Sequence, residues 1–298
     1  MKALSLLIKR NCKMFFKDKG LFFTSLITPL ILLVLYTTFL GEVYRDSFKM
    51  SLPQGMEIPE RLIEACVGGQ LFSSLLAVCC VTVAFCSNML MVQDKMTGAR
   101  NDLLIAPVKK STLAFGYYIA TAITTLIVCF VAALASFIYL ACVGWYLSFA
   151  DVCLLFLDIF LLSMFGTALS SMINCFLSTQ GQMSAVGTIV SAGYGFICGA
   201  YMPISQFSDG LQKAISLLPG TYGTSLIRNH ALAGAFEEMA AQGFPVEVVE
   251  SIKNSIDCNL YFFGNEVSVG AMYAVLAVSV LVLLGAYILV HKLSDKKK

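Results

Sequence analysis

The chain has 298 residues, of which 58% are hydrophobic and only 13% are charged. A soluble domain carries roughly a quarter charged residues, and several apolar runs here reach the approximately 20 residues that cross a bilayer. The composition therefore excludes a soluble globular domain and predicts an all-α integral membrane protein.

The chain begins with a basic amphipathic segment, residues 1–20, in which Lys9, Lys13 and Lys17 recur at helical spacing. Such a helix lies at the cytoplasmic interface beside anionic lipid headgroups, and docking to a protein partner is equally compatible with it. The apolar run that follows is too long for a signal peptide, so we expect it to be a retained span. The six predicted spans cover residues 21–41, 67–92, 112–141, 152–177, 183–203 and 267–290.

Basic residues near the span ends predict the orientation of the chain. Residues 1–20 contain six Lys and Arg, residues 94–110 contain four, and the tail after His291 contains four. The connections on the opposite side, residues 42–66 and 204–266, contain three each and more acidic residues than basic ones. We therefore expect a multi-pass protein of the plasma membrane with both termini in the cytoplasm.

The cytoplasmic connection between the second and third spans is DKMTGARNDLLIAPVKKS, residues 94–111, which carries six charges between two apolar stretches. By the distribution of basic residues alone it could be a solvated loop. Its combination of charged residues with a pair of leucines is equally suited to a docking surface.

The eleven cysteines lie mostly inside apolar runs, where Cys behaves as a small hydrophobic residue. No metal-ligand spacing of Cys and His occurs, so no metal site is expected. Cys66 and Cys258 could both face outward, and a disulfide between them is possible.

Two acidic residues of the fourth span, Asp151 and Asp158, lie seven positions apart and so near one face of a helix. They could form a proton or cation site. The favoured interpretation is that both lie in the outer third of the span, near water, and cap the helix. No basic residue occurs at the centre of any predicted span to complete a charge relay.

The fifth span has small residues every fourth position, at Gly187, Ser191, Gly195 and Gly199. Such a stripe lets helix backbones approach closely, either within one subunit or between two. The external connection that follows contains apolar helical pieces interrupted by Pro219 and Gly220, a pattern typical of re-entrant half-helices. An acidic surface helix is expected from Phe244 to Asp257.

No phosphate-binding loop, dinucleotide fingerprint, zinc-protease motif or nucleophile elbow occurs. The chain is therefore not expected to be an enzyme, and the energy for any pumping must come from a partner ATPase or from an ion gradient.

Two stretches resemble the membrane subunits of ATP-binding-cassette exporters of the ABC-2 type. In that family the connection after the second span reads roughly E-R-E-x-G-T-x-E-x-L-L-x-x-P, which VQDKMTGARNDLLIAPV matches except at Met96, Ala99 and Asn101. A second family signature, G-x-x-x-P followed by LNPLTY and LR, is similar to GAYMP at 199–203 and LLPGTYGTSLIR at 217–228. The resemblance extends over the whole chain.

The resemblance implies one ABC-2 type transmembrane domain over residues 1–298. It would comprise an interface helix (1–20), six transmembrane helices, a cytoplasmic coupling helix (94–108) between spans 2 and 3, external re-entrant helices (204–233) and an extracellular segment (234–266). Half of a dimer is expected, the other half being a second copy or a paralogue. Two separate ATP-binding subunits would bind ATP and Mg, with no cofactor bound by this chain. Membrane lipids are expected as partners and nucleic acid is not.

The resemblance also assigns roles to individual residues. The residues that would couple to the ATPase are Asp94, Lys95, Gly98, Arg100, Asp102, Leu103, Leu104 and Pro107. The residues at the dimer contact and pathway would be Pro29, Gly187, Ser191, Gly195 and Gly199, with Pro29 kinking the first span. The outer gate would contain Pro203, Pro219, Tyr222 and Arg228.

The function expected is export of a hydrophobic or amphipathic compound: a drug, an antimicrobial peptide or a lipid-linked compound. Three alternatives remain open at this point. They are a polysaccharide or lipid exporter permease, an ion-coupled secondary carrier that uses Asp158, and a membrane anchor or sensor subunit that does not transport.

Overall fold

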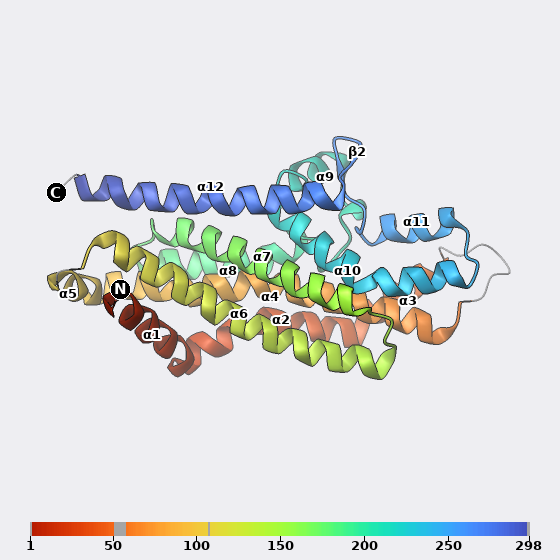
Figure 1. The fold of residues 1–298 in the computed structure, drawn as a ribbon, viewed down its shortest axis with the longest axis horizontal. Coiled ribbons are helices and arrows are strands. Elements are labelled where there is room, and N and C mark those ends of the chain that lie inside the picture. The colour runs from red at the N-terminus through yellow and green to blue at the C-terminus, as the bar shows by residue number, and fades with distance from the viewer. Residues whose placement is uncertain (1, 51–57, 107, 297–298) are drawn as a thin grey trace.

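The computed structural model describes residues 2–50, 58–106 and 108–296. The described elements are α1 (Lys2–Lys17), α2 (Lys19–Leu35), the π-helix η1 (Tyr36–Leu40), α3 (Gly41–Met50), α4 (Glu60–Met96), α5 (Ala99–Ile105), α6 (Lys110–Val143), α7 (Phe149–Asn174), α8 (Gln180–Ile197), the 3₁₀ turn η2 (Ile204–Gln206), α9 (Asp209–Ile215), α10 (Pro219–Ala241), α11 (Val246–Ser255), β1 (Tyr261–Phe262), β2 (Asn265–Glu266) and α12 (Val269–Lys296). Figure 1 shows the long helices running side by side in a bundle.

Local sequence signals define several of these helix ends. Ser148 and Asp151 form a capping box at the start of α7, and Thr179 and Gln182 form another at the start of α8. Each box satisfies backbone N–H groups that have no partner inside the helix. Pro219 begins α10, a position that lacks an intrahelical N–H bond in any case.

The helix α4 lies at the centre of the bundle. It contacts α2, α6, α7, α8 and α10, and 94% of its most apolar stretch is buried, against 11% for α12. Because α4 is covered on every side, it shows no separate polar face, and buried polar residues such as Ser87 and Asn88 hydrogen-bond to α6 and α7.

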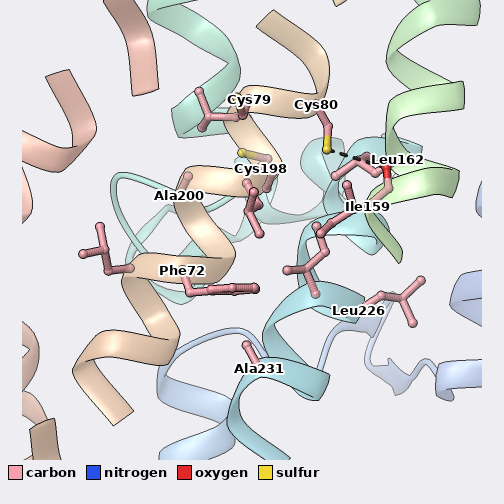
Figure 2. Close-up of a cluster of buried hydrophobic side chains, with 14 of the residues drawn as sticks. Phe72, Cys79, Cys80, Ile159, Leu162, Cys198, Ala200, Leu226 and Ala231 are labelled. Atoms are coloured by element: carbon pink, nitrogen blue, oxygen red, sulfur yellow. Dashed lines mark hydrogen bonds between the residues drawn. The ribbon is translucent and has the colours of Figure 1, made fainter. Parts of the chain in front are cut away.

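Glycines and apolar side chains allow the neighbouring helices to approach α4 closely. A Cβ at Gly166 of α7 would lie 2.7 Å from the carbonyl oxygen of Cys80 in α4. Figure 2 shows Phe72, Cys79 and Cys80 beside Ile159 and Leu162 of α7, with the Cys80 thiol donating to the Ile159 carbonyl at 3.8 Å. Dense packing of this kind is how membrane helices associate without a hydrophobic driving force.

Five helical stretches of the described chain are long and apolar enough to cross a membrane: Lys19–Asp46, Glu60–Met96, Lys110–Val143, Phe149–Asn174 and Val269–Lys292. They correspond to five of the six predicted spans. The fifth predicted span, 183–203, corresponds to α8, which has 18 residues and ends at Ile197. It is not among the five, so the count of six spans is not confirmed.

The long connection between α8 and α12 differs from the expectation in one respect. The interruption expected at Pro219 and Gly220 falls at the start of helix α10, which then continues for 23 residues to Ala241, through the expected boundary at residue 233. Fifteen of its residues are buried against the bundle. The predicted acidic helix is α11, in which Val249 and Ile252 are buried while Val246 is 72% exposed.

The basic segments meet at one end of the bundle. In Figure 1 the N-terminus, α5 and the C-terminus lie at the left, whereas α3 and α11 lie at the right. We call these the α5 end (residues 97–106 with the start of α1 and the end of α12) and the α11 end (residues 41–50 and 242–258). The grouping agrees with the distribution of basic residues, while the side of the membrane on which each end lies stays a prediction.

Candidate functional site: the junction around α5

The coupling segment predicted at 94–108 contains a short separate helix, α5. The helix α4 ends at Met96, and Gly98 then adopts a left-handed conformation with φ of 82° before α5 begins at Ala99. Glycine suits this position because a side chain strains the backbone at positive φ. The turn at Gly98 therefore sets the angle at which α5 leaves α4.

Asp94 is buried at the base of this turn and joins three helices. Its carboxylate accepts two hydrogen bonds from the Arg10 guanidinium of α1, at 2.6 and 2.9 Å, and one from the Tyr117 hydroxyl of α6, at 2.6 Å. Asp94 is 3% exposed. Bidentate geometry and burial make this the stronger kind of ion pair. The hydrogen bonds that Arg10 donates to Asp94 also raise the pKa of Arg10.

Lys95, the next residue, ties the same turn to α7. Its ammonium donates to the carbonyl oxygens of Asn174, Cys175 and Leu177, at 3.2, 2.6 and 3.0 Å. These carbonyls lie at the C-terminal end of α7, where backbone acceptors lack helical partners and a positive charge is favourable. Asp94 and Lys95 thus connect α4 with α1, α6 and α7.

The helix α5 has an inner and an outer face. Leu103 and Leu104 are half-buried and pack against the apolar cluster that includes Leu7 and Tyr117. On the outside, Asp102 is exposed and Ile105 is 83% exposed. Among the other predicted coupling residues, Arg100 is half-buried, whereas Pro107 lies outside the described residues.

A groove of about 550 Å³ separates α2, α4 and α8. Hydroxyl groups from α2 and α8, including Thr24, Thr28 and Ser191, share its lining with apolar side chains such as Ile27 and Met89. Gly187 lies on this groove, where an added Cβ would be 2.8 Å from Met89. The lining is therefore amphipathic.

Gly187 and Ser191 of the predicted dimer and pathway set thus line the groove, whereas Pro29, Gly195 and Gly199 lie elsewhere. An added Cβ at Gly195 would meet the ring of Tyr201, and Gly199 falls after the end of α8, with φ of 71°, so it is not on the helical stripe. Pro29 is buried in α2, whose helix continues through it. The π-helical turn at Tyr36–Leu40, rather than Pro29, is the irregular part of this span.

Arg228 is the centre of a second buried polar network, toward the α11 end. Although only 1% exposed, it donates to the carbonyl oxygens of Ile256 (2.7 Å) and Gly199 (2.9 Å) and to the Asp257 carboxylate (3.4 Å). It also reaches Ser74 of α4 at 3.4 Å. Burial raises the pKa of Asp257 even though Arg228 favours its charged form.

The remaining residues of the predicted outer gate surround this network. Pro203 precedes η2, and Pro219 begins α10. Tyr222 is buried and its hydroxyl donates to the Ser216 carbonyl at 2.5 Å. These residues fix the path of the chain between α8 and α10.

Three buried polar side chains of α4, η1 and α3 lack hydrogen-bond partners among the described residues. Gln70 is 0% exposed with both amide atoms unpaired, and the hydroxyls of Tyr36 and Tyr44 are also unpaired. The rings of Tyr36 and Tyr44 are stacked, with their centroids 5.5 Å apart. An unsatisfied buried polar group costs about 1–3 kcal/mol, so stability alone does not favour these residues here.

Asp151 and Asp158 have different environments. Asp151 caps α7, as predicted. The prediction for Asp158 was wrong: it is fully buried, and it bonds His230 of α10 and Tyr273 of α12. Cys66 and Cys258 are buried free thiols.

Four polar partners were not predicted from the sequence: Arg10, Tyr117, His230 and Tyr273. Arg10 was visible only as one of several basic residues, and His230 lies in a segment assigned to the exterior. No local pattern pairs any of them with an acid that is dozens of residues away.

Comparison with known proteins supports one family. The family model described as ABC-2 type transporter matches residues 2–232. A search of curated proteins found no match. The match covers the interface helix, the junction around α5 and the greater part of α10, so the chain belongs to the ABC-2 type transporter family.

Proposed function

We propose that this chain is the permease subunit of an ATP-driven exporter, and that it forms half of a pathway for a hydrophobic or amphipathic compound. As a member of the ABC-2 family it is a membrane-embedded permease component, and permeases of this family usually work with ATP-binding subunits. The sequence contains no phosphate-binding loop of its own.

The junction around α5 is the observation that carries the proposal. A short helix that merely connected α4 to α6 would not require a buried ion pair at the turn that precedes it. Here Asp94 and Lys95 link the turn before α5 to α1, α6 and α7. A force applied to α5 by an ATPase is therefore passed to four helices at once.

The outer face of α5 is the surface we assign to the ATPase. Asp102 is exposed and Ile105 is 83% exposed, whereas Leu103 and Leu104 are held by their own chain. An apolar anchor beside a charged residue is suited to a protein pocket with a polar rim. In this arrangement Leu103 and Leu104 transmit the movement of α5 inward.

The groove between α2, α4 and α8 is the segment of the pathway that this chain supplies. Its mixture of hydroxyl and apolar groups supports an amphipathic substrate. The small residues Gly187 and Ser191 on its α8 side would let a helix of a second permease copy or a paralogue approach this groove closely. The helix α8 then serves as the sixth membrane span.

The network around Arg228 is assigned to the outer gate. It joins α4, the segment after α8, and the loop after α11 through one side chain. Together with the start of α10 at Pro219, it would close the pathway at the α11 end as a re-entrant element. The excess of basic residues at the α5 end supports cytoplasmic termini and a plasma-membrane location.

Reconstitution with candidate ATPases tests the proposal. The chain is purified with each ATPase, placed in liposomes, and assayed for ATP hydrolysis and for outward transport of amphipathic dyes. We expect an ATPase to co-purify, and Ile105→Asp to abolish that association while the variant remains folded, because the residue touches little of its own chain. Val246→Asp, at the other end of the bundle, is the matched control.

Two outcomes would favour the rival functions. Transport that needs a proton gradient but no nucleotide would indicate a secondary carrier. A complex whose ATPase never responds to a substrate would indicate an anchor or sensor subunit. A third outcome, selective transport of a lipid-linked sugar, would leave the proposed ATP-driven permease in place and change only the class of its substrate.

A further inference from the structure

Asp158, His230 and Tyr273 form a buried cluster that joins α7, α10 and α12. One carboxylate oxygen of Asp158 lies 2.6 Å from Nδ1 of His230, and the other accepts a hydrogen bond from the Tyr273 hydroxyl at 2.5 Å. The rings of His230 and Tyr273 are nearly parallel, with centroids 6.3 Å apart. Each partner therefore comes from a different helix and meets the same carboxylate.

The charge of this cluster depends on one proton. Asp158 is fully buried, so an ionised carboxylate there has lost its hydration. A protonated His230 makes the pair neutral overall, whereas a neutral His230 leaves a net negative charge away from water. Burial thus favours the state in which the pair holds one proton. The His230 side chain is 12% exposed, which gives that proton a route in and out.

No other cation among the described residues is placed to replace His230. The helices that pack against α7 carry further titratable groups, including the cations Arg61 and Lys95 on α4, Lys110 on α6, Arg228 on α10 and His291, Lys292 and Lys296 on α12. In the described chain the titratable side chains that contact the Asp158 carboxylate are His230 and Tyr273, and the Arg228 guanidinium is bonded instead to Ile256, Asp257 and Gly199. His230 is therefore the cation placed to compensate an ionised Asp158.

We propose that Asp158, His230 and Tyr273 form a proton-binding site, and that the bound proton holds α7, α10 and α12 together. Loss of the proton leaves the buried carboxylate uncompensated, and α10 and α12 separate from α7 to hydrate it. Because His230 lies two residues after Arg228 on α10, this movement also displaces the Arg228 network. The site therefore makes that network sensitive to pH.

The proton site is independent of the export function proposed above, because it needs neither an ATPase nor a substrate. The chain has two histidines, so the full-length protein labelled with ¹⁵N-histidine and placed in lipid nanodiscs gives two side-chain spectra. His230→Gln assigns them. The spectra are recorded at about pH 7.5, where a free imidazole is mostly neutral.

We expect imidazolium signals from His230 in the wild type and neutral imidazole signals in Asp158→Asn. Asp151→Asn is the matched control, because it changes a carboxylate of the same helix that does not contact His230, and the His230 signals should stay those of the imidazolium. A neutral His230 in the wild type would overturn the proposal, and that spectrum decides the question even if a variant fails to fold. An imidazolium that persists in Asp158→Asn would overturn it as well.

Hydrogen exchange at the same pH tests whether the bound proton holds α7, α10 and α12 together. His230→Gln should exchange the amides of α10 and the first turns of α12 at least about tenfold faster than the wild type, because it leaves the buried carboxylate without its compensating charge, whereas Asp158→Asn removes that carboxylate and should change exchange much less. Asp151→Asn should leave these segments unchanged. Exchange that is as slow in His230→Gln as in the wild type would show that the proton does not hold these helices together.

Discussion

The guanidinium of Arg10 and the carboxylate of Asp94 are joined by two hydrogen bonds, although 84 residues separate them in the sequence. The pair connects the first helix of the chain to the end of its central helix, directly before the turn into α5. The interface helix is thereby part of the junction and moves with it.

A double-mutant cycle on this pair measures that connection. Arg10→Met should destabilise the protein by about 2 kcal/mol, because it leaves a buried carboxylate with Tyr117 as its remaining side-chain donor. Asp94→Asn combined with Arg10→Met should lose less than the sum of the two single changes, with a coupling of about 1–2 kcal/mol. Thermal unfolding in lipid nanodiscs provides the measurement, and strictly additive effects would refute the connection.

The turn at Gly98 gives a second prediction. An alanine here has free space but a left-handed backbone, so Gly98→Ala should cost about 1–2 kcal/mol locally and tilt α5. Asparagine tolerates this conformation better, so Gly98→Asn should retain most of the coupling of ATP hydrolysis to transport. Equal loss in both variants would show that the backbone conformation is not what matters.

The two faces of α5 should respond differently to truncation. Leu103→Ala should destabilise the protein by about 1–2 kcal/mol, because half of that side chain packs on its own chain. Ile105→Ala should leave stability within about 0.5 kcal/mol of the wild type but weaken ATPase binding. Unfolding and co-purification measured on the same samples separate the two effects. A stability loss at Ile105, or intact ATPase binding after its truncation, would reverse the assignment.

The buried amide of Gln70 is expected to lower the stability of the protein while serving transport. Gln70→Leu removes two unsatisfied polar atoms from a fully buried site and should raise the free energy of unfolding by about 1–3 kcal/mol. If the polar group serves the pathway when the helices move, the same change should slow transport. The control is Leu71→Met, a neighbouring conservative change. A destabilised Gln70→Leu protein would mean that the amide has a partner in the native state.

The sequence predicted those features that depend on local pattern. Apolar runs located five spans, and the resemblance to the ABC-2 motif from Asp94 to Pro107 pointed to the segment that contains α5. The capping role of Asp151 also follows from its distance of three residues from Ser148. Each of these signals lies within one helix turn or one continuous segment.

The features that were missed depend on how helices pack. The fifth predicted span was placed too far along the chain, because Cys198 to Pro203 is apolar but turns back after Gly199. Asp158 was expected near water, since nothing in its own helix indicates that His230 and Tyr273 cover it. Contacts of this kind are set by the arrangement around α4, which leaves no periodic trace in the sequence.

Site-specific photocrosslinking tests the central claim most directly. A photoreactive residue is placed at position 105, on the outer face of α5, and in a second protein at position 246, on the exposed face of α11. Both are expressed with the ATPase that co-purifies with the chain. The account predicts a crosslink from position 105 to the ATPase and none from position 246. A crosslink from position 246 alone would place the motor at the opposite end and contradict the account.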